Sequence, residues 1–419
     1  NSLVDRACFN RINCDGFSDL DGNGLVDTYG LVRIDFDSNP NVQLLGRLSN
    51  YKPNDGTNTF SFAFARELRN SSTGVTYATS NTIDPQARGF LVPNWAEIIN
   101  LSDNQAYRYE LFNANGSLVF SETTPVLSVG QEIDLQGGHE LAGQGIYLAR
   151  VTPLGEGTYL FSMARYSSNA PVNVVPDTFN YAFSVDSRVG TETKQYALLS
   201  NQETDVWNQM NFLELVNTSD TIATATVVFR GASSVLDTQN FTIQPRSQVH
   251  VDAGTILGLR GESQGVAEVT SNVAGSLIAQ SITYFRNRAD GMVEAAYLST
   301  AKFANDSTIT GSTNTFLDMR NIIRLASATD VNVVTNLTLG TFTMSGPIVL
   351  PAEQVVNVTV NSGASLELDL FEISTIGANS YGPFIATTPL VGQIVAEIQR
   401  VRFKDGGSKV DYVMPTLVR

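Results

Sequence analysis

Residues 14–27, CDGFSDLDGNGLVD, bring together oxygen-bearing side chains that suit a metal ion. Acidic or amide residues occupy the first, third, fifth and ninth positions of a loop that starts at Asp19, and Gly24 at the sixth position permits a sharp turn. A loop wraps calcium at this spacing, with a backbone carbonyl at the seventh position. Because such side chains repel one another without a cation, the sequence predicts a calcium site. Its predicted ligands are Asp19, Asp21, Asn23, the Leu25 carbonyl and Asp27.

The loop departs from an EF-hand at its end. Position 12 is Gly30 where an EF-hand has a bidentate Glu, and residues 28–37 have the pattern of a strand. The stretch 19–27 therefore resembles the calcium loops of thrombospondin type 3 repeats and dockerins. This resemblance implies further ligands from nearby chain, for which Asp15, or Asp35 and Asp37, are the candidates. The alternative is a solvated turn, since Asp, Asn and Gly are favoured in turns.

Cys8 and Cys14 are the two cysteines of the chain and lie beside the acidic loop. Two cysteines without a nearby His cannot form a tetrahedral zinc site. A short disulfide between them is geometrically feasible and is the prediction, with two free buried thiols as the alternative.

The chain offers few residues for catalysis. His139 and His250 are the two histidines, and neither lies near a nucleophile motif. His139 is expected in a loop and His250 on the solvent face of a strand. A carboxylate pair for glycoside hydrolysis needs no sequence motif. Its candidates, each expected on a wet strand or turn, are Glu214, Glu262 and Glu268. The sequence therefore predicts no catalytic residue.

Composition narrows the class of protein. Charged residues make up 16% of the 419 residues, below the usual quarter, and hydroxyl and amide side chains take their place. The net charge of −15 argues against nucleic acid and against an anionic membrane surface. No apolar run reaches the roughly 18 residues of a membrane helix. A polar surface of this kind is typical of secreted and cell-surface β proteins, so an extracellular location is predicted.

Three sequence markers recur in the same order at intervals of about 110 to 120 residues. The first marker aligns Phe64, Phe183 and Tyr297 in residues 59–69, 178–188 and 292–302. The second ends at Asp103, Asp220 and Asp330. The third occupies residues 159–166, 277–286 and 394–403. Repetition of three markers in order predicts three copies of one structural module.

Within each module the pattern is that of short strands. Residues 355–360 set three Val on one face and polar residues on the other, which is the period of a half-buried strand. Gly- and Asn-rich turns separate such runs. We therefore predict an all-β fold of three tandem antiparallel β-sandwich domains. The predicted divisions are 1–55 for the calcium-loop segment and 56–173, 174–289 and 290–419 for the sandwiches.

The modules resemble the β-sandwich modules of secreted bacterial surface proteins. The resemblance rests on the turns in residues 217–220 and 244–251, with looser copies in 100–103 and 350–356. It implies a spacer or assembly module. Trp95 and Trp207 precede two copies of the second marker, and this equivalent placement favours core packing over a sugar platform.

These features predict a non-enzymatic extracellular structural protein that self-associates into a filament, pilus-like fibre or surface layer. The alternatives are a monomeric adhesin or carbohydrate-binding stalk, with glycan or cell-surface contacts, and a secreted glycan-active enzyme. Residues 408–419 alternate like a strand. They either add to the sheet of a neighbouring subunit or supply the final strand of their own domain.

Overall fold

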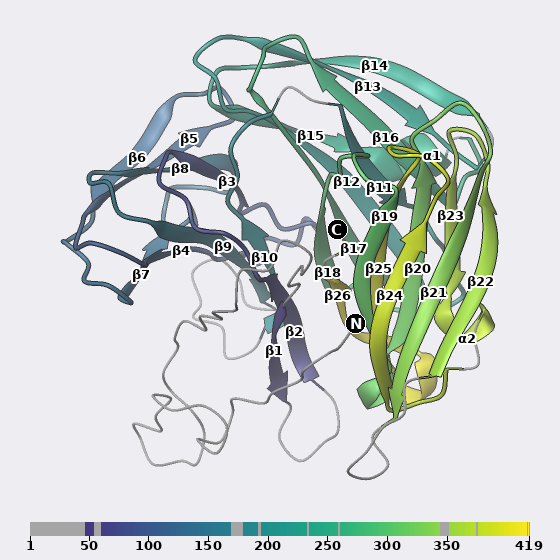
Figure 1. Cartoon of the computed structure of the whole chain (residues 1–419). Helices are drawn as coiled ribbons and strands as arrows, with labels where there is room; N and C mark the ends of the chain where they lie inside the picture. Colours follow the sequence, from purple (N-terminus) through teal and green to yellow (C-terminus); the bar gives the residue numbers. More distant parts are fainter. Residues whose placement is uncertain are drawn as a thin grey trace.

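The structure is a computed structural model that describes residues 47–53, 60–168, 179–191, 194–232, 234–258, 260–343, 352–373, 376–416 and 418. These residues form an all-β fold of six four-stranded antiparallel sheets and one two-stranded sheet (Figure 1). The six larger sheets pair into three sandwiches, which confirms the predicted fold class. The calcium-loop segment lies outside the described residues.

Three units of eight strands each make up most of the molecule. Unit 1 contains β3 (Thr76–Asn81), β4 (Asn94–Asn100), β5 (Tyr107–Asn113), β6 (Leu118–Thr123), β7 (Glu132–Gln136), β8 (Ile146–Pro153), β9 (Tyr159–Ser168) and β10 (Phe179–Asp186). Unit 2 contains β11 (Gln195–Ser200), β12 (Trp207–Asn217), β13 (Ala223–Arg230), β14 (Val235–Ile243), β15 (Ser247–Asp252), the short helix α1 (Ala253–Gly258), β16 (Gln264–Ser271), β17 (Leu277–Asn287) and β18 (Val293–Thr300).

Unit 3 contains β19 (Thr308–Asn314), β20 (Arg320–Ser327), β21 (Val333–Thr343), β22 (Ala352–Val360), β23 (Ser365–Asp369), α2 (Leu370–Ile373), β24 (Ser380–Thr387), β25 (Ile394–Lys404) and β26 (Lys409–Thr416), with 3-10 turns at Phe316–Asp318 and Asp405–Gly407.

All three units share one topology. One sheet places the first, sixth, third and fourth strands side by side, as in β3-β8-β5-β6. The other places the eighth, seventh, second and fifth strands side by side, as in β10-β9-β4-β7. We call these the first and second sheet of a unit. Units 2 and 3 repeat both orders strand for strand, so the sequence repeat is a repeat of topology.

Alternation of side chains builds each core. In β13 every second residue is buried, and Ala225, Val227 and Phe229 pack into the space between the two sheets of unit 2. Equivalent apolar clusters fill units 1 and 3. The period of two therefore directs one face of each sheet to the core and the other face outward.

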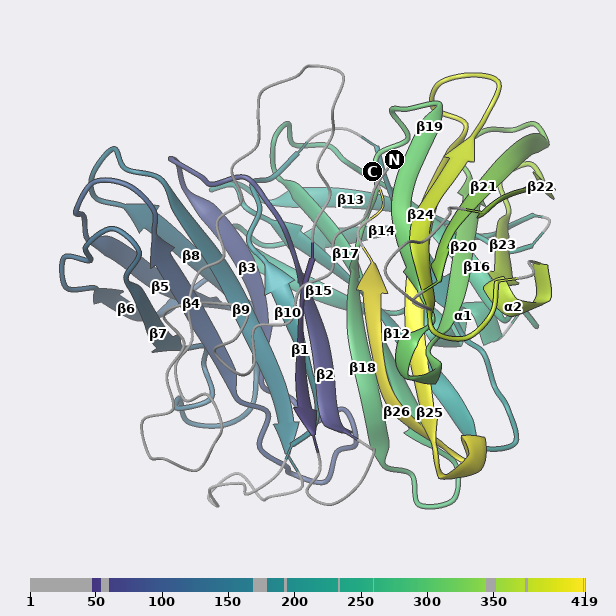
Figure 2. The ribbon, with the colours of Figure 1, turned by 60° about the horizontal axis from the view of Figure 1, so that its bottom comes forward.

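The eighth strands of the units meet along a common axis. A two-stranded hairpin, β1 (Arg47–Pro53) with β2 (Phe60–Glu67), adds a fourth strand. Contacts run from β2 to β10, from β10 to β18, from β18 to β26 and from β26 back to β2, which closes a ring of four strands near the middle of the molecule (Figure 2). We call these four strands the central ring.

The hairpin is equivalent to the last two strands of a unit. β1 pairs with β2 as β9, β17 and β25 pair with the eighth strands of their units. In all four pairs the register skips one residue near the start of the ring strand, which is a β-bulge. The skipped residues are Ser61, Asn180, Glu294 and Asp411. The central ring is therefore fourfold in pattern, with three complete sandwiches and one hairpin.

The pairing also locates the sequence markers. Residues 60–67, 179–186 and 293–300 of the first marker are ring strands. The second and third of them end units 1 and 2 instead of starting units 2 and 3, and the first is the ring strand of the hairpin. β26 is a fourth ring strand. It pairs with β25 of its own unit, so the C-terminal strand supplies the last strand of its own sandwich in this structure.

Candidate functional site

The second sheet of each unit carries charge on the face that points away from the core. The second strand places Glu97, Glu214 and Arg324 at equivalent positions. On the fifth strand their cross-strand partners are Asp134, His250 and Glu367. On the seventh strand their partners are Ser162, Gln280 and Glu397. These positions form the chemically richest part of the described chain.

In unit 2 the carboxylate of Glu214 is fully buried against unit 1. Its Oε1 lies 3.0 Å from Nε2 of His250 and 3.6 Å from the Arg165 guanidinium. Its Oε2 accepts hydrogen bonds from Thr79 at 2.7 Å and Gln280 at 2.6 Å. Burial alone would raise the pKa of Glu214, but the charges of His250 and Arg165 and the hydrogen bonds from His250 and Gln280 lower it to about 2. Because Arg165 and Thr79 belong to unit 1, this cluster joins units 1 and 2.

In unit 3 the residue equivalent to Glu214 is Arg324, so a buried cation replaces the buried carboxylate. Arg324 is buried and its Nη1 lies 3.3 Å from Glu397 and 3.2 Å from the Tyr297 hydroxyl. Its Nη2 donates to the Leu199 carbonyl, and the Ser299 hydroxyl donates to Glu397. Burial lowers the pKa of Arg324, but Tyr297 and the two glutamates outweigh it and raise the pKa overall. Leu199, Tyr297 and Ser299 belong to unit 2, so this cluster joins units 2 and 3.

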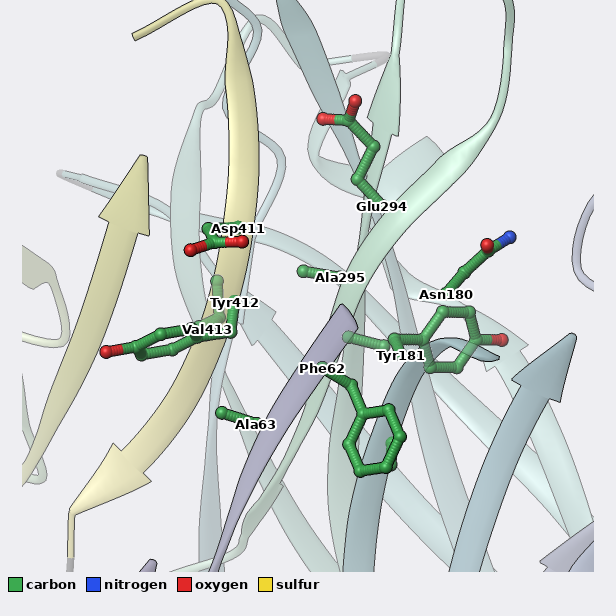
Figure 3. A pocket seen from close by; sticks show the side chains of 11 residues that line it. Phe62, Ala63, Asn180, Tyr181, Glu294, Ala295, Asp411, Tyr412 and Val413 are labelled. Atoms are coloured by element: carbon green, nitrogen blue, oxygen red, sulfur yellow. The ribbon is translucent and has the colours of Figure 1, made fainter. Parts of the chain in front are cut away.

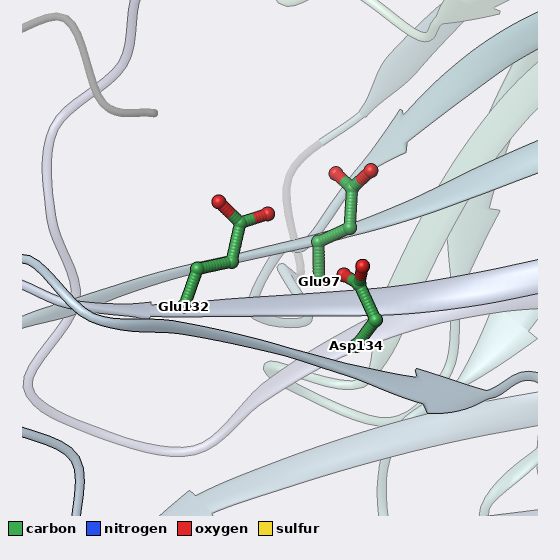
Figure 4. A group of neighbouring side chains, drawn as sticks. All are labelled: Glu97, Glu132 and Asp134. Atoms are coloured by element: carbon green, nitrogen blue, oxygen red, sulfur yellow. The ribbon is translucent and has the colours of Figure 1, made fainter. Parts of the chain in front are cut away.

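In unit 1 the equivalent residue is Glu97, and two further carboxylates lie beside it (Figure 4). Carboxylate oxygens of Glu97, Glu132 and Asp134 lie within 4.8 Å of one another. Arg66 of β2 forms an ion pair with Glu97. Partial burial raises the pKa of Glu132 to about 7 and that of Asp134 to about 6, and the charge of Glu97 adds to both shifts. Three carboxylates that share one arginine favour the approach of a cationic group.

The structure separates the carboxylates that the sequence singled out. Glu214 lies in the unit 1–unit 2 interface, whereas Glu268 on β16 pairs with Lys194 and Arg230. Glu262 accepts a hydrogen bond from the backbone N–H of Ala232. Glu214 was expected on a wet strand and His250 in solvent, and both expectations are wrong because unit 1 covers that face.

His139 and Trp207, which the sequence also singled out, pack against other side chains of the fold. The ring of His139 packs edge-on against Trp95 with centroids 4.5 Å apart, and burial lowers the pKa of His139. Trp207 is buried beside Phe285 and Tyr297. The predicted calcium ligands Asp19, Asp21, Asn23, Leu25 and Asp27, and the predicted disulfide partners Cys8 and Cys14, lie outside the described residues.

The space inside the central ring is narrow (Figure 3). Phe62, Tyr181, Ala295 and Tyr412 line it with neighbouring residues of the four strands, and the space between these side chains is too narrow to admit a water molecule. The ring is therefore a packed junction between the units.

Comparison with known protein families, with curated proteins and with solved structures finds no match to this chain. Among the described residues, no helix has the length and apolar character needed to cross a bilayer.

Proposed function

We propose that this chain is a non-enzymatic structural protein of the cell exterior that self-associates through the outer edges of its sheets. The proposal rests on an edge strand that recurs at the same place in all three units. The fourth strand of every unit, β6, β14 or β22, is the last strand of its first sheet in the described structure.

Each of these three strands has an apolar side chain in solvent. Val119 on β6, Val235 on β14 and Val355 on β22 are 39%, 50% and 57% exposed. None of the three strands contains Lys or Pro, two residues that commonly block pairing at a sheet edge. An edge of this kind favours strand-to-strand association with another sheet. Three such edges on one chain support growth of a lattice or a filament.

The proposal also includes a bound calcium ion and an extracellular location. The alternating oxygen ligands in residues 19–27 support calcium bound at the modest affinity of extracellular modules, with dissociation constants of about 10⁻⁴ to 10⁻³ M. The low content of charged residues and the hydroxyl-rich surface support a secreted or surface-exposed protein. A disulfide between Cys8 and Cys14 is proposed to hold the segment that enters the loop.

The test is assembly of the purified chain with calcium, followed by light scattering and negative-stain electron microscopy. We expect polymers that the triple variant Val119→Lys, Val235→Lys and Val355→Lys abolishes. The control is Val189→Lys with Leu390→Lys, two exposed apolar positions outside the strands. A chain that stays monomeric at high concentration, or polymers that survive the triple variant, would overturn assembly through these edges.

A further inference from the structure

The outward face of the second sheet is an interface in two of the three units. In unit 2 its Val216 is fully buried against Tyr77 and Leu148 of unit 1. In unit 3 the equivalent Ala326 is fully buried against Leu198 and Val266 of unit 2. In both cases the covering residues come from the first and sixth strands of the preceding unit.

Hydrogen bonds confirm how the preceding unit sits on this face. Gln248 of unit 2 donates to the Ser80 carbonyl at 3.1 Å and to the Tyr147 carbonyl at 2.6 Å, which belong to the first and sixth strands of unit 1. Gln264 on the sixth strand of unit 2 donates to the Ser365 carbonyl of unit 3 at 3.4 Å. A sheet edge therefore covers this face twice in the same manner.

Unit 1 presents the same face with less cover. Ile99, at the position of Val216 and Ala326, is only half-buried, and Glu132 takes the position of Gln248. Asp134, at the position of His250, is the most exposed of the three carboxylates. In the described part of the chain, the preceding position of the central ring holds the β1–β2 hairpin, which reaches this face through Arg66. Among the described residues, the hairpin is not joined by strands equivalent to the first and sixth strands of a unit.

The charges on the face of unit 1 indicate what can cover it. In unit 2 the preceding unit brings Arg165 to Glu214. In unit 1, Arg66 is the one cation that the described residues bring into an ion pair with the three carboxylates, and the charge of Glu97 adds to the burial that raises the pKa values of Glu132 and Asp134. A second copy of this chain, with its net charge of −15, has the wrong overall sign for this surface.

We propose that the outward face of β4 and β7, formed by Ile99, Glu97, Glu132 and Asp134, docks a β-sheet edge of a basic partner protein. The partner's arginine or lysine side chains meet the three carboxylates as Arg165 meets Glu214, and an apolar side chain covers Ile99 as Leu148 covers Val216. The repeated interfaces within the chain give the shape of the contact, and the unbalanced carboxylates give its charge.

The probe is a seven-residue peptide of alternating Arg and Thr, titrated into the full chain by calorimetry at low salt. At a pH above the pKa values of both groups, Glu132→Gln with Asp134→Asn removes two charges at nearly constant size, and we expect it to weaken binding about fivefold or more. The control pair Glu140→Gln and Glu156→Gln removes two exposed charges from unit 1 and is expected to leave the affinity within about twofold.

Circular dichroism establishes that both double variants fold, and a matching peptide of alternating Glu and Thr should not bind. Equal weakening by the two double variants would show that the peptide responds only to net charge, which would overturn the proposal. Absence of binding to the unmodified chain would overturn it as well.

Discussion

The carboxylate of Asp411 accepts a hydrogen bond from the backbone N–H of Phe60 at 3.0 Å, across 351 residues of sequence. Glu294 accepts the equivalent bond from Val410 at 2.9 Å. Both acceptors are the bulged residues of their ring strands, and the donors are the first residue of β2 and the second residue of β26, the next strands of the ring. The bulge therefore turns a side chain toward the neighbouring strand and links the central ring in sequence.

Asp411→Ala should detach the β1–β2 hairpin from unit 3. Asp411 is buried and also pairs with Arg402 and, at 3.4 Å, with Lys404, so its removal takes the carboxylate away from two partly buried cations. We expect a loss of about 2–4 kcal/mol, measured by urea unfolding. Proteolysis should then cut first between the hairpin and unit 1. Asp306→Ala, at an exposed position, is the control. An unchanged proteolysis pattern would contradict a linking role for Asp411.

The Glu214 cluster should make stability depend on pH in the acid range. Its pKa is lowered from 4.5 to about 2 in the folded chain. A lowered carboxylate pKa means that the folded state resists protonation, so the stabilisation is complete above about pH 4.5 and is lost as the pH falls toward 2. We expect Glu214→Gln to reduce this dependence in thermal unfolding followed from pH 5 to pH 2. Glu262→Gln should retain it. A Glu214→Gln chain with the slope of the unmodified protein would contradict the assignment.

Arg324→Leu should destabilise the junction of units 2 and 3 by about 3–5 kcal/mol, because it leaves the fully buried Glu397 without its cation. Adding Glu397→Leu should recover part of the loss, since a buried ion pair can often be replaced by apolar residues at small cost. Urea unfolding of the single and double variants measures this difference. If the two losses simply add, Arg324 and Glu397 are not energetically coupled.

Glu132→Gln should stabilise the chain above neutral pH. Its pKa is raised from 4.5 to about 7, so the folded state holds a proton that the unfolded state has released, and stability declines as the pH rises from about 4.5 to 7. Glutamine carries no charge at any pH. We expect a gain of about 1–3 °C in melting temperature at pH 8 and a smaller difference at pH 4. Glu140→Gln serves as the control, and a larger gain at pH 4 than at pH 8 would contradict the prediction.

The sequence repeat already contained the charged positions. Glu97, Glu214 and Arg324 lie in the three copies of the second marker, so their equivalence could be predicted from spacing. Their burial could not. Alternation in β15 correctly directs Val251 inward and His250 outward, but it does not show that another unit covers the outward face. What covers a strand's outer face depends on contacts between units, which local sequence pattern does not encode.

The sequence also could not show which unit each copy of the first marker belongs to, for a related reason. A ring strand has the same sequence pattern whether it begins one unit or ends another, because both of its faces are packed. Phe183 lies on β10, which hydrogen-bonds to β9, and this pairing assigns the strand to unit 1. Pairing partners follow from the whole topology, so the copies of the marker could be found in the sequence while their assignment to units could not.

The closed ring also constrains the order of events during synthesis. β2 leaves the ribosome early, but its neighbour β26 follows more than three hundred residues later, as the 351-residue separation of Phe60 and Asp411 requires. Each sandwich can fold from its own eight strands while translation continues. The apolar side of β2 that packs against β26 stays uncovered until β26 has been synthesised. The nascent chain therefore exposes this side of β2 until the last contact of the central ring forms.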